Sequence, residues 1–69
     1  MPSSVIADID YETKGRRLVV TFTTGRVYEY FDVPAEVVTA FRISLSKGIF
    51  FNARIRDQYR CREIVPPPR

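Results

Sequence analysis

The chain has 69 residues, with one cysteine and no histidine. This length indicates a single domain with a thin core, because so short a chain buries only about 60% of the surface that its unfolded form exposes. The composition excludes an intrachain disulfide, a thiolate zinc site and histidine as a general base. No apolar run approaches the roughly 18 residues of a membrane span, and the N-terminus lacks a signal-peptide core, so we expect a cytoplasmic domain held together by packing alone.

The first strand is predicted at residues 5–11, where apolar and polar side chains alternate. The predicted inward positions are Val5, Ala7, Ile9 and Tyr11. On the outer side, Asp8 and Asp10, followed by Glu12, carry the carboxylates that Mg²⁺ prefers. Alternating acids on an edge strand more often prevent aggregation, so we expect no metal, no cofactor and no catalytic residue.

A β-hairpin follows, and its turn at residues 23–25 sets its register. Gly25, at the last position of a three-residue loop, suits the left-handed backbone that this position requires. The loop places Leu18 opposite Tyr30 and Val20 opposite Tyr28. A two-residue loop would instead place Thr21 opposite Tyr28. We prefer the first register because it gathers the larger apolar groups on one face.

The hairpin register assigns its aromatic and apolar side chains to two faces. Tyr28 and Tyr30 either form part of the core or stack nucleobases, and we favour the core because so thin a core needs large side chains. Val19, Val27 and Phe31 lie on the opposite face. An apolar patch there needs a cover, so we predict a protein interface at these three residues.

Two helical segments and a last strand are predicted in the second half of the chain. A helix begins at residues 33–34, because proline suits the first helical position, and Ser46 caps a second, short segment. The stripe of the main helix that should lie on the sheet consists of Val37, Val38, Phe41 and Leu45. Residues 59–64 alternate again and predict a strand, and residues 66–69 predict a disordered, proline-rich tail.

Together these elements predict an α+β domain over residues 3–65. Its sheet is an antiparallel β-meander of three strands plus a C-terminal strand, with one main helix packed on one face and a short helical segment. The order and spacing of the motifs resemble the KTSC domain. The residues that carry the resemblance are Ser4, Tyr11, Leu18-Val19-Val20-Thr21-Phe22, Gly25, Tyr28-Glu29-Tyr30, Val33-Pro34, Ser46-Lys47-Gly48, Phe51-Asn52, Ile55-Arg56 and Tyr59.

The resemblance implies a small bacterial domain that also occurs at the C-terminus of some lysyl-tRNA synthetases. The function of this family is not established. The synthetase context implies RNA binding.

The charge distribution adds an independent indication of a partner. Residues 1–35 carry four basic and five acidic side chains, whereas residues 36–69 carry seven basic and three acidic ones. Between Arg42 and Arg62, six basic groups accompany a single acid, Asp57. This pattern is typical of a surface that meets an anionic partner. A solvated basic face on a small domain with a net charge of only +3 explains the same pattern.

The sequence therefore predicts a non-catalytic binding module, with RNA binding as the first hypothesis. Arginine predominates among the basic groups, and its planar guanidinium suits bidentate contact with phosphate. The predicted nucleic-acid-binding residues are Arg42, Lys47, Arg54, Arg56, Arg60 and Arg62. The alternative is a protein-interaction module, either a homodimer or an appendage docked on a larger enzyme.

Overall fold

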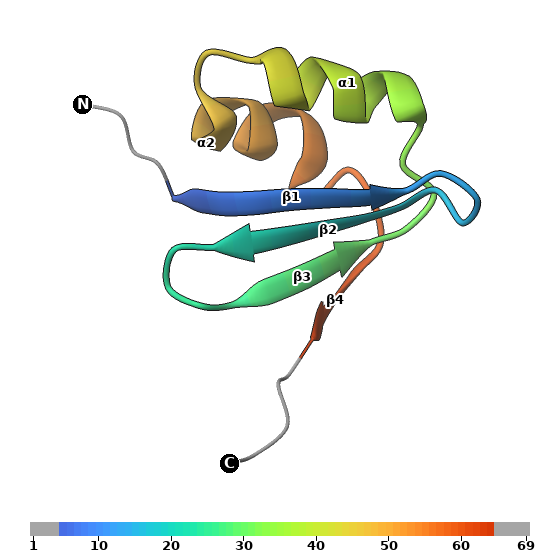
Figure 1. Ribbon diagram of the computed structural model, residues 1–69, viewed down its shortest axis with the longest axis horizontal. Helices are drawn as coiled ribbons and strands as arrows, with labels where there is room; N and C mark the ends of the chain where they lie inside the picture. The colour runs from blue at the N-terminus through green and yellow to red at the C-terminus, as the bar shows by residue number, and fades with distance from the viewer. Residues whose placement is uncertain (1–4, 65–69) are drawn as a thin grey trace.

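The computed structural model describes residues 5–64 as a four-stranded antiparallel sheet with a helical layer on one face (Figure 1). The strand order is β1-β2-β3-β4, and the predicted α+β fold is confirmed. The predicted tail at residues 66–69 lies outside the described residues. The elements are β1 (Ile6–Glu12), β2 (Arg17–Phe22), β3 (Val27–Tyr30), α1 (Ala35–Ile43), α2 (Lys47–Phe50), the π-helical turn η1 (Phe51–Ile55) and β4 (Cys61–Ile64).

Strand β1 contains an irregularity that the alternation of its side chains did not predict. Ile6 pairs with Phe22, but Asp8 already pairs with Thr21, so the register shifts between Ile6 and Asp8. Such a bulge exchanges the inward and outward positions on one side of it. Ile6 therefore packs against the core, and the predicted inward placement of Val5 and Ala7 is wrong, because both are exposed.

The hairpin register is confirmed. Leu18 pairs with Tyr30 and Val20 pairs with Tyr28. The loop between them has three residues, since the N–H of Phe22 donates to the carbonyl of Arg26 at 2.8 Å. Gly25 has a φ of +96°, a conformation that glycine adopts without steric cost.

Helix α1 begins later and ends earlier than predicted. Pro34 precedes the helix as its N-cap, with ψ at 146°, instead of occupying the first helical position. Val38 and Phe41 are buried, as expected. After Ile43 the chain becomes extended at Ser44, so Leu45 leaves the helical stripe. The predicted inward placement of Leu45 is therefore wrong, and this side chain is fully exposed, with a relative accessibility of 105%.

The short helical segment closes the core. The hydroxyl of Ser46 accepts a hydrogen bond from the N–H of Ile49 at 3.3 Å, which confirms the predicted cap. Phe51 and Ile55, one turn apart, both point into the core. The buried core consists of Leu18, Val20, Tyr30, Val33, Val38, Phe41, Phe51 and Ile55. These residues come from β2, β3, the connection between β3 and α1, α1 and η1, so the core lies between the sheet and the helical layer.

Candidate functional site

The two tyrosines of the hairpin differ in their surroundings. Tyr30 is only 4% exposed, and its ring lies edge-to-face against Phe51, with 5.7 Å between ring centroids. Burial raises the pKa of Tyr30 to about 12. Tyr28 is half-buried and lies two residues closer to the β2–β3 loop. Tyr30 is therefore a core residue, as predicted, whereas Tyr28 has one side available to a ligand.

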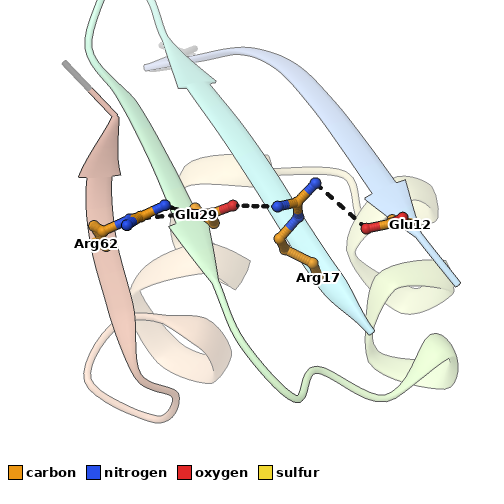
Figure 2. Close-up of polar contacts among 4 residues, drawn as sticks. All are labelled: Glu12, Arg17, Glu29 and Arg62. Atoms are coloured by element: carbon orange, nitrogen blue, oxygen red, sulfur yellow. Dashed lines mark hydrogen bonds and ion pairs between the residues drawn. The ribbon is translucent and has the colours of Figure 1, made fainter. Parts of the chain in front are cut away.

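The face of the sheet opposite the helices carries a network of ion pairs across all four strands (Figure 2). Its centre is Glu29. This residue is only 3% exposed, although no second layer covers this face within residues 5–64. One carboxylate oxygen of Glu29 accepts from Nη1 of Arg17 at 2.7 Å. The other accepts from Nε and Nη2 of Arg62 at 3.2 and 2.9 Å. Arg17 also pairs with Glu12 at 3.3 Å.

Cross-strand pairing explains this network. Glu12 pairs with Arg17, and Glu29 pairs with Arg62, so each couple lies side by side on one face. Arg17 is displaced by two positions from Val19, the direct partner of Glu29, and reaches the carboxylate diagonally. Sequence reasoning missed Glu29 as the centre of the network. The predicted hairpin register already placed Arg17 near Glu29. No feature of the neighbouring sequence indicated the register of β4, which places Arg62 opposite Glu29.

The predicted apolar interface lies beside this network. The strand register places Val19 and Val27 on the open face, and Phe31 follows β3. All three side chains are half-buried. The need for an external cover remains a prediction.

The six predicted cations do not form one cluster. Arg62 is bound to Glu29 on the open face. Arg42 and Lys47 lie beside β1, where they line a hollow of about 300 Å³. The guanidinium of Arg54 lies 5.6 Å from the ring centroid of Phe50. The other two follow η1, and the backbone carbonyl of Arg60 accepts from the N–H of Phe31 at 2.9 Å. Within residues 5–64, Arg62 alone among the six pairs with a carboxylate.

A larger hollow of about 530 Å³ opens between the β2–β3 loop, η1 and β4. Its aromatic wall consists of Phe22, Tyr28, Tyr30 and Phe51. Phe22 holds this wall together, since its ring centroid lies 5.7 Å from that of Tyr28 and 5.3 Å from that of Phe51, both edge-to-face. We call this hollow the hairpin pocket.

The polar groups of the hairpin pocket come from three distant parts of the chain. They are Arg26 near the loop, Asn52 and Arg56 from the end of the helical layer, Asp57, and the thiol of Cys61. Hydrogen bonding with the Tyr28 side chain and the nearby charge of Glu63 raise the pKa of Arg26. Arg56 contacts the Asn52 amide oxygen at 3.4 Å. The arrangement combines an apolar ring-lined wall with two guanidinium groups, which suits a flat ligand that carries negative charge.

Between residues 5 and 64, no group of three or more histidine, cysteine or carboxylate side chains is placed to hold a metal ion. No helix over the same range is long and apolar enough to cross a membrane.

The fold and the hairpin pocket define a small α+β domain with a four-stranded meander. The KTSC domain family model matches residues 2–59, and the chain belongs to this family. A crystal structure of a KTSC domain protein from Yersinia pestis superposes with a TM-score of 0.83 at 34% identity, covering 94% of both chains.

Two kinds of relative are similar in sequence. A lysine–tRNA ligase of Nostoc punctiforme is 38% identical over 61 residues, which is 88% of this chain but only 11% of the ligase. The chain thus spans a small part of the ligases that it matches. A protein of Tsukamurella paurometabola is 32% identical over 59 residues, covering 86% of this chain and 88% of that protein.

Proposed function

We propose that this domain is a non-catalytic module that binds single-stranded RNA through phosphate contacts. The observation that carries the proposal is the charge of the helical layer. Residues 37–56 contain no carboxylate, whereas they contain four cations. These cations are Arg42, Lys47, Arg54 and Arg56, and they lie along α1, α2, η1 and its C-terminal cap. A polyanion that lies along residues 37–56 therefore meets only cationic charges, and the carboxylates of Glu36 and Asp57 flank this stretch.

The acidic groups of the amino-terminal half lie on the other side of the sheet. Asp8, Asp10 and Glu12 pair with Thr21, Val19 and Arg17, which places all three on the open face of β1. The sheet thus separates Asp10 and Glu12 from the helical layer, whereas Asp8 lines the same hollow as Arg42 and Lys47. This separation supports RNA binding on the helical side. The electrostatic repulsion between a carboxylate and a phosphate is largely screened once they are farther apart than about a Debye length, ~10 Å at 0.1 M salt.

The relatives support the same proposal. Three of them are lysine–tRNA ligases, proteins whose name states that they act on a tRNA. A basic module within such a ligase carries the charge that contact with RNA requires. The same chemistry serves a separate small protein of this family, because phosphate contacts do not depend on nucleotide sequence.

The salt dependence of binding tests this proposal. If about four phosphates are neutralised, log affinity for a single strand falls with log salt at a slope near −3. The double substitution Arg54→Glu, Arg56→Glu should weaken binding to unrelated RNA sequences equally, because phosphate contacts position the RNA without reading it. The matched control is Lys14→Glu, Arg16→Glu, which makes the same charge change on the β1–β2 turn and should weaken binding much less. Absence of binding at about 50 mM salt would refute the proposal.

A protein-interaction module is the second candidate, and one observation favours it. Ile43, Leu45 and Ile49 are large aliphatic side chains near the junction of α1 and α2, and all three are strongly exposed. Neighbouring exposed apolar groups of this size are typical of a docking surface. Sedimentation equilibrium over a range of protein concentrations tests for self-association. A monomer at every concentration, together with RNA binding, would leave RNA binding as the function.

A further inference from the structure

The hairpin pocket has no role in a purely electrostatic mode of RNA binding, yet it has a definite chemistry. It exists because the helical layer does not cover the whole inner face of the sheet. Leu18 and Val20 are fully covered and Tyr30 is 4% exposed at the pocket wall. Tyr28 is half-buried, and Cys61, which pairs with Tyr30, is exposed. The uncovered part of the face is bounded by the β2–β3 loop and the end of η1.

Apart from the carboxylate of Asp57, the charged, amide and aromatic groups that line the hairpin pocket match the parts of a nucleotide. The aromatic wall suits a flat ring. The amide of Asn52 can both donate to and accept from the edge of a base. The guanidinium groups of Arg26 and Arg56 suit phosphates, and neither forms an ion pair with a carboxylate within residues 5–64.

The size and connections of the pocket fit the same ligand. Its volume of about 530 Å³ lies within the range of about 300–1,000 Å³ that small-molecule sites occupy. Arg56 belongs both to the pocket and to the row of cations along the helical layer. A strand that follows those cations therefore reaches the pocket mouth. A base of a duplex cannot enter, because it is stacked and paired, whereas an unpaired base is free to turn inward.

We infer that the hairpin pocket receives one unpaired nucleobase of a single-stranded RNA, with the flanking phosphates on Arg26 and Arg56. This inference rests on the proposed function, since the helical layer holds the strand whose base enters the pocket. It adds a contact that depends on the base and not on phosphate. A probe that keeps the phosphates but lacks the bases therefore distinguishes this inference from the proposed phosphate binding.

The first experiment compares two probes with the unaltered protein at about 50 mM salt. One is an oligouridine of about eight nucleotides, and the other is the same phosphate chain with abasic spacers in place of every base. We expect the abasic chain to bind at least about fivefold more weakly, because base–aromatic contacts of the usual strength correspond to roughly 5- to 150-fold. Equal affinities would overturn the inference and leave phosphate binding intact. No binding of either chain would refute the proposed function itself.

Cys61 provides a second readout, because it is the only cysteine of the chain and it is exposed at the pocket wall. A thiol-labelling reagent should react about tenfold more slowly at an oligouridine concentration of about ten times Kd, since only the free protein reacts. The abasic chain, at the same occupancy, should leave the labelling rate unchanged. Protection by an acidic, aromatic peptide but not by oligouridine would show a protein-binding pocket and overturn the inference.

A matched pair of amide truncations completes the test. Asn52→Ala removes an exposed pocket side chain and should weaken oligouridine binding roughly 3–10-fold, the loss expected for a hydrogen bond to a base edge. It should weaken binding of the abasic chain less than binding of oligouridine, because Asn52 touches a phosphate-binding group only through its 3.4 Å contact with Arg56. Gln58→Ala removes an exposed amide outside the pocket lining and should change neither affinity. Equal effects of the two substitutions would contradict a base in the pocket.

Discussion

The ion-pair network on the open face leads to a quantitative prediction about Glu29. The substitution Glu29→Gln keeps the shape of the side chain but replaces one carboxylate oxygen by an NH₂ group. Because Arg17 occupies one oxygen and Arg62 the other, either orientation of the amide points a donor at a guanidinium donor. The variant therefore loses one charge-assisted contact entirely and weakens the other.

The structure sets the expected magnitude. Breaking a fully buried ion pair costs about 3–5 kcal/mol, but here only the acid is buried. The Arg17 and Arg62 side chains are 45% and 70% exposed, so water replaces part of what each arginine loses. We expect Glu29→Gln to lower the free energy of unfolding by about 1.5–3 kcal/mol, the range for hydrogen bonds to charged groups.

Glu12 provides a matched control, because it pairs with the same Arg17 at 3.3 Å but its side chain is 56% exposed. Glu12→Gln should cost less than about 0.5 kcal/mol, as exposed ion pairs usually do. Urea unfolding with linear extrapolation measures both values, and an unchanged m-value confirms that the two-state comparison holds. In a domain of this size, a loss of about 2 kcal/mol lowers Tm by about 8–16 °C. Equal losses for the two variants would refute the claim that burial of Glu29 makes this network stabilising.

Three other predictions follow from the same structure. Because burial raises the folded-state pKa of Tyr30 from 10 to about 12, its contribution to stability is complete below pH 10 and is lost as the pH rises to about 12. In a spectrophotometric titration, Tyr30→Phe should remove a tyrosine step near pH 12, and loss of a step near pH 10 instead would contradict burial. Gly25→Ala should lower the free energy of unfolding by about 1–2 kcal/mol in thermal or urea unfolding, because its φ of +96° is unfavourable for alanine. No atom lies within 4 Å of the added Cβ, so a clash does not contribute, and a neutral substitution would contradict this backbone conformation. Phe31→Glu should lower the sedimentation mass if the open face joins two copies, and identical monomer masses for variant and wild type would exclude that dimer.

Local sequence patterns determined the hairpin, the helical cap and the fold class. The pairing of Leu18 with Tyr30 follows from the strand period of two and from a glycine at the third loop position. The cap at Ser46 follows from its side-chain oxygen, which reaches an N–H only three residues away. Each of these features depends on groups that are close in the chain, so the choice among conformations is made locally.

Tertiary packing decided the features that such patterns predicted wrongly. The bulge in β1 lets Ile6 fill the core, although simple alternation assigned the inward side to Val5 and Ala7. The end of α1 at Ile43 leaves Leu45 in water, although it continues the apolar spacing of the helix. In both places the spacing of apolar residues along the sequence fits the predicted element. The bulge in β1 and the extended backbone after Ile43 then change which residues face inward.

The candidate sites were the least predictable part of the chain. The sequence alone indicated the basic residues by type and separated the apolar group of Val19 and Val27 from the core face. It did not indicate that Arg62 would lie on Glu29, 33 positions earlier in the chain, or that Arg26 and Arg56 would face one hollow. These contacts depend on where β4 and η1 close onto the hairpin. The positions of β4 and η1 depend on how the whole core packs, which involves residues far apart in the chain and cannot be read from a local pattern.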